Sequence, residues 1–443
     1  MITDWPDEAR NALWAHLRSA RWFGGKGGSG ELSAVIPLPW YVTPTDVSPG
    51  VRSEIAVITY PDQVEHYHLL LAYGDLADNF GAVTLPGHGR VSVGDACTDP
   101  RTRRLLWQAM ATEQVLTQDA TTDGIGAELV IGADDSAAAS LDEDVSVFGG
   151  EQSNTSLIIG ETLIMKLFRK LEPGRNLDIE RHRDLADAGN TDIAALHGWV
   201  EARWITGDGG THDVDLAMII EQFAGVQDGW SLALQMCASG ASFAREAGEL
   251  GAALHRVHQS LAADVDDARI SGDALADTLD QQLAEAIAVA DVLAPYADGL
   301  RQRFAVLRGR TIDVQPVHGD LHLGQVLHSR TGWKIIDFEG EPVKSMAQRR
   351  MPASPWRDVA GILRSFSYVA ASVDGDEAAA RAWAAEASDA FLAGYRPSGC
   401  TLAEQDLLTA QIADRAAYEI MYETRNRPDW VHIPLHDVAA LAH

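Results

Sequence analysis

The spacing of apolar and polar residues divides the chain into an N-terminal part of mainly strands and a C-terminal part of mainly helices. Residues 30–95 contain short apolar runs such as 54–60 (EIAVITY) and 66–72 (HYHLLLA), separated by turn residues. This pattern predicts a mainly β region. A helical pattern is expected over residues 97–118, and a helix at the N-terminus with Asp4 as its N-cap and Pro6 in its first turn.

From residue 145 to 225 the pattern predicts strand, glycine-rich turn, strand, helix, strand and strand. The helix is expected near residues 176–188, and the last strand at residues 216–222 (LAMIIEQ). From residue 226 onward the chain reads as mostly helical. Residues 245–262 place apolar side chains at 247, 250, 254, 257 and 261, the three-and-four spacing of one buried helix face. Further helices are expected at residues 355–373, 376–395 and 404–423.

Two boundaries are expected along the chain, one from composition and one from the change of pattern. Residues 120–144 are polar and small, and we place a domain boundary there. A second junction is expected near residues 222–228, where the strands give way to helices. A β-rich lobe followed by a helical lobe is the layout of kinases, although a fold class alone does not fix a function.

Charge and cysteine content restrict the partners and the compartment. The net charge of -29 repels nucleic acid and anionic membranes, so an ATP site would need its own cations and a metal. No apolar run approaches the roughly 18–20 residues that span a bilayer. The N-terminus lacks the pattern of a signal peptide, and the three cysteines show no C-x-x-C spacing. We therefore expect a cytoplasmic protein without nucleic-acid or membrane partners.

The strongest chemical signal is VHGDLHLGQV at residues 317–326, followed by IIDFEGEP at residues 335–342. Residues 325–328 and 333–336 are strand candidates around a four-residue turn. The resulting hairpin would pair His328 with Trp333 and place Gln325 beside Asp337. Oxygen-bearing side chains thus converge at one end of the hairpin, with Asp320 just upstream. Magnesium prefers such hard oxygen ligands.

This arrangement resembles the catalytic and metal loops of the kinase superfamily. The resemblance implies that Asp320 orients the acceptor hydroxyl and takes its proton, and that Gln325 and Asp337 bind the metal. Glu339 replaces the glycine that commonly follows Asp-Phe and is a further candidate ligand. The alternative is a surface β-hairpin with polar ends.

A second signal indicates a phosphate-binding turn. Residues 145–156 (VSVFGGEQSNTS) contain Gly149 and Gly150, which permit close backbone approach, and Ser153, whose hydroxyl can hold a phosphate oxygen. Lys166 follows on the next expected strand. We interpret it as the lysine that binds the α- and β-phosphates, although a lysine flanked by apolar residues is usually a snorkelling surface residue.

Glu180 lies on the next expected helix, at a chain distance typical of the Lys–Glu pair of kinases. Asp178 is a competitor for this role, and a surface acid is the alternative interpretation of Glu180. Residues 221–223 would form the hinge between the lobes. The backbone groups of Glu221 and Phe223 would then contact adenine.

Two other motifs are weaker. Residues 21–27 (RWFGGKG) could suggest a second phosphate loop, but no helix start follows, so a structural loop is favoured. His255 and His258 are three residues apart on an amphipathic helix with no third ligand nearby, so packing is favoured over metal binding.

Three segments together resemble the actinobacterial maltokinases, which belong to the aminoglycoside-phosphotransferase-like kinases. They are HGDLHLGQVL, IIDFEGEP and residues 349–368 (RRMPASPWRDVAGILRSFSY). RWFGGKG and residues 423–435 (ETRNRPDWVHIPL) are also similar to this family. The resemblance implies an α+β, eukaryotic protein kinase-like bilobal fold. It divides the chain into an N-terminal cap domain (1–135), an intermediate subdomain with the nucleotide-binding sheet and a helix (136–225) and an α-helical C-lobe (226–443).

Residues 411–430 depart from the maltokinases. Asp-Arg-Ala-x-Tyr-Glu, starting at Asp414, is similar to a related group of actinobacterial glucosamine kinases. The resemblance places the sugar in an acidic groove of the C-lobe beside Asp320. The expected sugar-binding residues are His322, Gln411, Asp414, Tyr418, Glu419, Glu423 and Trp430, most of which share one helix at helical spacings with Tyr422. Asp414 could instead be a solvated or salt-bridged helix acid, and Arg415 could offset its charge.

The sequence therefore predicts an ATP- and Mg²⁺-dependent sugar kinase that forms glucosamine 6-phosphate and works as a monomer. A maltokinase that forms maltose 1-phosphate is the alternative. A pseudokinase that binds ligands without catalysis is an alternative of another class. The presence of Lys166, Asp320, Gln325 and Asp337 argues against the pseudokinase.

Overall fold

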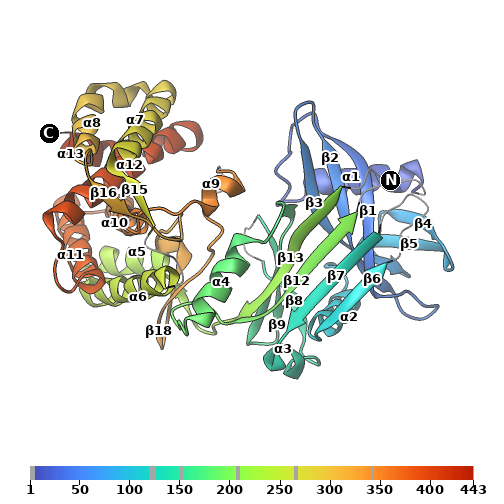
Figure 1. The fold of residues 1–443 in the computed structure, drawn as a ribbon. Helices are drawn as coiled ribbons and strands as arrows, with labels where there is room; N and C mark the ends of the chain where they lie inside the picture. Colours follow the sequence, from blue (N-terminus) through green and yellow to red (C-terminus); the bar gives the residue numbers. More distant parts are fainter. Residues whose placement is uncertain are drawn as a thin grey trace. The chain divides into compact units, whose positions relative to one another are not determined.

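The computed structural model describes residues 5–118, 126–149, 153–205, 210–263, 268–341 and 344–442. The chain forms two compact units (Figure 1). The N-terminal unit contains residues 1–180 and 195–224, and the C-terminal unit contains residues 181–194 and 225–443. The expected junction near residues 222–228 therefore coincides with the passage of the chain from one unit to the other.

The first half of the N-terminal unit is a six-stranded antiparallel sheet in the order β1-β2-β3-β5-β4, with β11 paired to β3. The β region expected at residues 30–95 is confirmed. Helix α1 packs Leu13 and Leu17 against one face of this sheet, where Tyr67 and Tyr73 are buried. The elements are α1 (Asp7–Ser19), β1 (Glu31–Val42), β2 (Gly50–Thr59), β3 (Val64–Gly74), β4 (Gly81–Leu85), β5 (Gly89–Asp95) and β11 (Lys170–Leu171). The expected N-cap, Asp4, lies outside the described residues.

The second half is a seven-stranded sheet in the order β6-β7-β12-β13-β10-β9-β8. Its elements and their helices are α2 (Pro100–Met110), β6 (Gln114–Gln118), β7 (Gly126–Ala133), α3 (Asp135–Ala139), β8 (Val145–Val147), β9 (Thr155–Ile159), β10 (Leu163–Leu167), α4 (Leu177–Asp187), β12 (Leu196–Ile205) and β13 (Thr211–Glu221). The sheet crosses the boundary expected near residue 135, and the division into cap and intermediate subdomain stays a prediction.

One expectation for this region is wrong in part, because the helix expected over residues 97–118 ends at Met110. Residues Gln114–Gln118 are instead the edge strand β6, paired with β7. Its side chains alternate between half-buried and exposed, with Val115 and Thr117 outward. Two β-branched residues at a period of two suit a pleated strand better than a helix.

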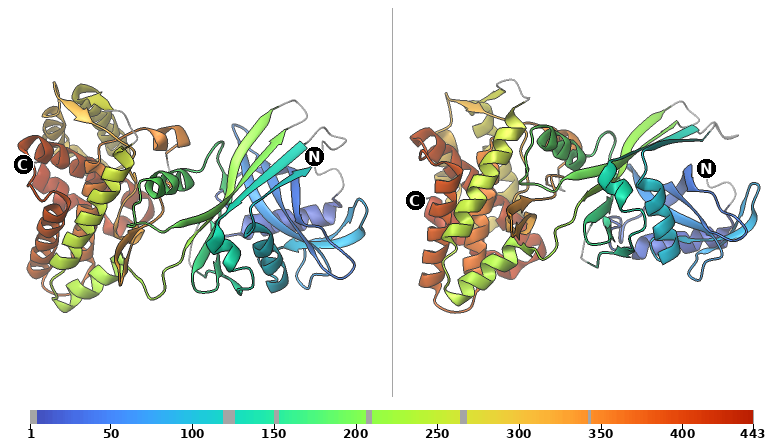
Figure 2. Two further views of the ribbon diagram at one scale, coloured as in Figure 1. Left: turned by 60° about the horizontal axis from the view of Figure 1, so that its bottom comes forward. Right: turned by 90° about the horizontal axis from the view of Figure 1, so that it is seen from below.

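The two sheets of the N-terminal unit share one buried core. Apolar side chains of the six-stranded sheet, such as Ile55 and Leu70, join Trp107 of α2 and Leu129 and Leu157 of the seven-stranded sheet. Figure 2 shows the blue strands beside the cyan and green strands. The two sheets therefore pack as one body.

The C-terminal unit is mostly helical, and the helices expected at residues 245–262, 355–373, 376–395 and 404–423 are confirmed. The five apolar positions predicted for the first of these are all buried. The helices are α5 (Gly229–Ser239), α6 (Ala244–Ala262), α7 (Gly272–Val289), α8 (Ala297–Ala305), α9 (Met346–Arg350), α10 (Trp356–Ser372), α11 (Glu377–Tyr395), α12 (Leu402–Asn426) and α13 (His432–Leu441). Short 3₁₀ helices occur at Asp291–Tyr296, Leu323–Gln325 and Pro428–Trp430.

Short strands complete this unit: β14 (Gln227–Asp228), β15 (Arg269–Ser271), β16 (Thr311–Asp313), β17 (Val326–Ser329) and β18 (Gly332–Ile335). Helix α12 begins with a capping box in which Thr401 and Glu404 bond each other's backbone N–H groups. Among the described residues, no helix combines the length and the hydrophobicity that crossing a membrane requires.

Candidate active site

The hairpin β17–β18 has the register expected from the sequence. His328 pairs with Trp333, and the Ile336 N–H donates to the Gln325 carbonyl at 3.0 Å. The side chains at the hairpin's open end meet, since Gln325 Nε2 donates to Asp337 Oδ2 at 3.0 Å. The predicted convergence of Gln325 and Asp337 is therefore present.

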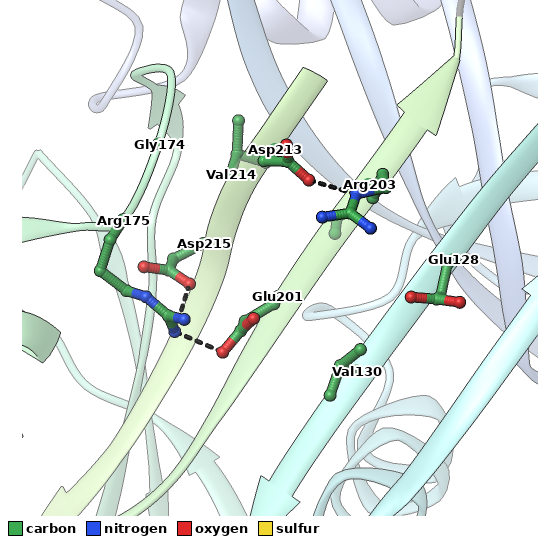
Figure 3. A pocket seen from close by; sticks show the side chains of 10 residues that line it. Glu128, Val130, Gly174, Arg175, Glu201, Arg203, Asp213, Val214 and Asp215 are labelled. Atoms are coloured by element: carbon green, nitrogen blue, oxygen red, sulfur yellow. Dashed lines mark hydrogen bonds and ion pairs between the residues drawn. The ribbon is translucent and has the colours of Figure 1, made fainter. Parts of the chain in front are cut away.

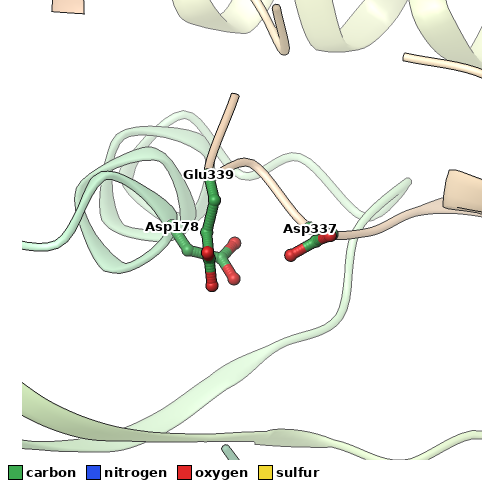
Figure 4. Close-up of side chains that lie close together, drawn as sticks. All are labelled: Asp178, Asp337 and Glu339. Carbon is green, nitrogen blue, oxygen red and sulfur yellow. The ribbon is translucent and has the colours of Figure 1, made fainter. Parts of the chain in front are cut away.

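Asp337 has a φ of 68°, in the left-handed region that residues other than glycine rarely adopt. Strained backbone of this kind concentrates at functional sites. Figure 4 shows the carboxylates of Asp337 and Glu339 on the segment after β18, and one oxygen of each lies within 4.8 Å of the other. Rotating the Gln325 side-chain amide by a half-turn would bring its oxygen to the same side as these carboxylates. Oxygen ligands of this kind are the hard ligands that divalent cations select.

A buried carboxylate from α10 holds the loop that carries Asp320. The N–H groups of His318 and Gly319 donate to Asp358 at 2.8 and 2.9 Å. His258 Nε2 lies 2.9 Å from the same carboxylate. Burial alone would raise the pKa of Asp358, but His258, His318 and the Gly319 N–H outweigh it and lower the pKa. His258 is thus a buried, hydrogen-bonded residue, as the packing interpretation expects.

Helix α10 lies directly against this loop because Gly361 has no side chain. A Cβ at Gly361 would lie 2.2 Å from the carbonyl oxygen of Leu321. The next residue of the loop, His322, accepts the Gly324 N–H at Nδ1 at 3.0 Å. Burial lowers the pKa of His322, against the opposing charge of Asp320. His322 therefore shapes the turn that leads to Gln325.

Arg415 of α12 connects Asp320 to a cluster of acids. Its Nη2 lies 2.9 Å from Asp320 Oδ1, its Nη1 lies 3.1 Å from Glu341 Oε1, and its Nε lies 3.7 Å from Glu419 Oε1. The guanidinium also sits 5.5 Å from the centre of the Tyr418 ring. The sequence analysis considered Arg415 only as a neighbour that could offset Asp414 and missed this bridge.

A pocket of about 240 Å³ opens beside this bridge. It is lined by three of the expected sugar-binding residues, Gln411, Asp414 and Tyr418, and by polar residues that the sequence analysis did not assign, including Glu341, Lys344, Gln348 and Arg357. Burial raises the pKa of Asp414 to about 6, although Arg357 and Lys344 oppose the rise. Burial likewise would raise the pKa of Glu341, but Arg357, Lys344 and Arg415 lower it.

Glu419, Glu423 and Trp430 are not among the residues that line this pocket. Glu419 pairs with Arg364 at 2.8 Å. Glu423 is 2% exposed and pairs with Arg427 at 2.7 Å. Trp430 stacks on Tyr368 with ring centres 6.5 Å apart. Their roles in sugar binding stay predictions.

In the N-terminal unit, Lys166 of β10 donates to Asp178 of α4 at 3.0 Å. Both side chains are largely buried, at 15% and 3% exposure. The acid that the structure pairs with Lys166 here is thus Asp178, the competitor in the sequence analysis. A pairing of Lys166 with Glu180 stays a prediction.

The start of α4 is tied to β13 through Asp215. Its carboxylate accepts the Asn176 N–H at 2.5 Å, and the Asn176 side chain accepts the Asp178 N–H at 2.8 Å. Arg175 holds Asp215 and Glu201 together at one side of a pocket of about 200 Å³ (Figure 3). Asp215 thereby fixes the backbone from which Asp178 reaches Lys166.

The remaining nucleotide-site candidates are placed as follows. Ser153 is exposed just before β9, and Gly150 lies outside the described residues. The Glu221 and Gln222 N–H groups already donate to the carbonyls of Ala195 and Thr162, at 2.9 and 2.7 Å. Because the Glu221 N–H already donates to the Ala195 carbonyl, it is not a spare donor for adenine. Contacts of Glu221 and Phe223 with adenine stay predictions.

The RWFGGKG segment makes structural contacts. Lys26 Nζ donates to the Arg21 carbonyl at 3.2 Å, and Phe23 is buried in the core beneath α1. A Cβ at Gly25 would lie 2.1 Å from the Tyr60 hydroxyl, so this turn needs a glycine. These contacts agree with the interpretation as a structural loop.

The fold and the site together define a kinase-like phosphotransferase. Residues 144–397 match the family described as Phosphotransferase enzyme family, and the chain belongs to this family. The expected ATP-dependent phosphotransferase class and the kinase-like α+β fold are thereby confirmed. Enzymes of this class act with a divalent cation bound to the nucleotide.

Two curated relatives are glucosamine kinases. The protein from Streptacidiphilus jiangxiensis is 30% identical over 321 residues, which is 64% of this chain and 70% of that protein. The protein from Mycolicibacterium smegmatis is 26% identical over 316 residues, covering 64% and 76%. A solved structure of a glucosamine kinase in complex with glucosamine, ADP and inorganic phosphate matches with a TM-score of 0.65 at 23% identity, covering 97% and 99% of the two chains.

Proposed function

We propose that this protein transfers the γ-phosphoryl group of ATP to O6 of glucosamine. One observation carries the proposal: Arg415 joins Asp320, at 2.9 Å, to the pocket that Asp414 and Tyr418 line. The acid expected to accept the hydroxyl proton therefore stands beside a cavity with the chemistry of an amino-sugar site. The glucosamine kinases among the relatives support the same acceptor.

In this proposal Asp320 accepts the proton of the sugar hydroxyl as the new O–P bond forms and the bond to ADP breaks. Phosphoryl transfer depends mainly on positioning and charge stabilisation. The ion pair with Arg415 orients the Asp320 carboxylate at the edge of the pocket. Asp358 and Gly361 fix the backbone of the loop, so the carboxylate is held in place before the substrate binds.

Asp414 is the group proposed to select an amino sugar. A carboxylate that accepts a hydrogen bond from an ammonium forms one of the stronger hydrogen bonds in proteins. The Tyr418 ring offers an apolar surface for the pyranose, and Gln411 offers an amide for its hydroxyls. A neutral disaccharide would use the ring and the amide equally well. The carboxylate of Asp414 is therefore the group proposed to favour an amino sugar over a neutral sugar.

Mg²⁺ is the proposed metal, held by the oxygens of Asp337, Glu339 and Gln325. It would neutralise charge on the phosphates of the nucleotide. We expect Asp337→Ala to raise the magnesium concentration needed for half-maximal activity, while the KM for glucosamine stays unchanged. An unchanged magnesium requirement would remove Asp337 from the metal site.

The proposal is tested by kcat/KM for glucosamine, glucose and maltose with ATP and Mg²⁺. A preference for glucosamine, with a product that matches authentic glucosamine 6-phosphate, is the expected result. A preference for maltose would replace the acceptor and restore the maltokinase alternative. Nucleotide binding without turnover on any sugar would favour a pseudokinase.

A further inference from the structure

Arg169, three residues after Lys166, is buried inside the N-terminal unit with 2% exposure. Its guanidinium reaches three separate segments of the chain. Nε donates to Thr155 Oγ1 at 2.8 Å, Nη1 donates to the His68 carbonyl at 3.1 Å, and Nη2 lies 3.6 Å from Cys97 Sγ. One side chain thus joins β3 and the turn after β5 to the first residue of β9.

The backbone of Arg169 strengthens the same junction. Its N–H donates to Asn154 Oδ1 at 3.3 Å, and its carbonyl accepts the His68 N–H at 2.8 Å. The guanidinium also stacks 4.9 Å from the ring centre of Trp22, in the RWFGGKG segment. Arg169 is therefore the point at which the six-stranded sheet, the RWFGGKG loop and the start of β9 meet.

The position of this junction matters because of what β9 and β10 carry. Lys166 of β10 lies opposite Ser156 of β9, and Leu167 lies opposite Thr155. Asn154 and Thr155 directly follow Ser153, the hydroxyl proposed to bind phosphate. A shift of Thr155 relative to β10 would therefore displace Ser153 relative to Lys166.

Burying a guanidinium is costly, and an apolar side chain would hold two sheets together at lower cost. What the guanidinium adds is a rigid planar fork whose donors fix several acceptors in one geometry. Such fixed geometry is useful in a phosphate-binding site, where two neighbouring strands must be positioned to within a fraction of an ångström.

We propose that Arg169 is a positioning residue for ATP: it uses the six-stranded N-terminal sheet as a support that sets Asn154 and Thr155 against the strand of Lys166. This inference rests on the proposed ATP site in the same unit. It assigns the six-stranded sheet a part in nucleotide binding, although the sheet itself supplies no proposed ligand to ATP.

The test compares Arg169→Lys with Arg52→Lys. Arg52 is a matched control, because it belongs to the six-stranded sheet that Arg169 contacts, stacks 4.5 Å from the Trp40 ring and pairs with Glu54 at 2.5 Å. Its partners Trp40, Glu54 and Tyr73 belong to β1, β2 and β3. Affinities for Mg·ADP and for adenosine would be measured by calorimetry on folded protein, with KM values for ATP and glucosamine beside them.

We expect Arg169→Lys to weaken Mg·ADP binding and raise the KM for ATP by about tenfold, the factor for one lost hydrogen bond of a charged group. Adenosine affinity and the KM for glucosamine should stay within about twofold, because the phosphate contacts alone are displaced. Arg52→Lys should leave all four values unchanged. A role in stability alone would lower the melting temperature of both variants without separating ADP from adenosine.

Thr155→Val keeps the volume of the side chain and removes the acceptor of Arg169 Nε, so it decides the matter if Arg169→Lys does not fold. It should raise the KM for ATP severalfold with adenosine affinity unchanged. Equal ADP and adenosine losses, or no ADP loss in either folded variant, would overturn the inference. Failure of the proposed ATP site looks different, because the unmutated protein would then not bind Mg·ADP. A wrong acceptor, or no turnover on any sugar, would appear in the kcat/KM values of the unmutated protein and leave the Mg·ADP comparison intact.

Discussion

Two pockets of this protein have similar size and are both lined by acids and arginines, yet they differ in what these charged groups do. The pocket of about 200 Å³ in the N-terminal unit is lined by four acids and two arginines. There Arg175 pairs with both Glu201 and Asp215, and Asp215 also accepts the Asn176 N–H. The pocket of about 240 Å³ in the C-terminal unit is lined by three acids, two arginines and a lysine.

The C-terminal pocket differs in three respects. Burial raises the pKa of one of its carboxylates, Asp414, to about 6, and the Tyr418 ring forms part of its wall. Arg415 of this pocket also pairs with Asp320, at 2.9 Å. A cluster of acids is therefore a poor marker of an active site by itself. The useful markers are a perturbed carboxylate, an aromatic surface and a proton acceptor at the pocket's edge.

The largest contrast is expected between Asp320→Asn and Asp213→Asn. Removing the proton acceptor should lower kcat by on the order of 10²–10⁴ and leave ATP affinity within a few-fold. Asp213 lines the N-terminal pocket and pairs with the exposed Arg203, so its variant should keep kcat. Steady-state kinetics with saturating substrates measure both. A kcat near that of the unmutated enzyme in Asp320→Asn would take the C-terminal pocket out of the chemistry.

The next contrast lies within the C-terminal pocket. Asp414→Asn should raise the KM for glucosamine at least about tenfold, because a charge-assisted hydrogen bond contributes roughly 1.5–3 kcal/mol. The KM for glucose should hardly change. Glu285→Gln is the matched control, since Glu285 lines the same pocket and is exposed. Equal changes for glucosamine and glucose would mean that Asp414 does not contact the amino group.

The pH dependence of the KM for glucosamine tests the role of Asp414 in the unmutated protein. Asp414 is ionised above its pKa of about 6 and protonated below it. The KM for glucosamine should therefore rise as the pH falls from 7 to 5, by about tenfold one unit below the pKa. The ratio of the glucosamine and glucose KM values isolates this effect. A ratio that rises equally in Asp414→Asn would assign the titration to another group.

The smallest effect is expected in the N-terminal pocket. Asp215→Asn keeps the size of the side chain but weakens the hold on Asn176, from which Asp178 reaches Lys166. We expect the KM for ATP to rise about threefold, as for the weakening of one hydrogen bond, with the KM for glucosamine unchanged. Glu128→Gln, in the wall of the same pocket, should change neither value. A similar rise in both variants would point to a general electrostatic effect.

Local patterns made much of the site predictable. The register of the β17–β18 hairpin follows from a short turn between two strands, so the meeting of Gln325 and Asp337 could be derived from spacing. The buried face of α6 followed from the three-and-four repeat. In both cases the contacts that matter lie within about one element of each other along the chain.

The contacts that the sequence did not predict depend on how distant segments pack. Arg415 and Asp320 are 95 residues apart, and nothing near either residue indicates the other. The partner of Lys166 depends on the phase of α4, which the backbone contact of Asp215 with Asn176 fixes from β13. The residue types identified Asp178 and Glu180 as candidate partners of Lys166, but they do not show which of the two lies beside the lysine.

The seven-stranded sheet has a consequence for dissecting the protein into fragments. The family match begins at residue 144, but β6 and β7 come earlier and belong to the same sheet as β10. A fragment trimmed to the family limits would strip β7 from β12, and an unpaired hydrophobic edge invites aggregation. Chimeras between relatives are better joined between Met110 and Gln114, where α2 has ended and β6 has not begun. The boundary drawn by sequence similarity is therefore a poor place to cut the gene.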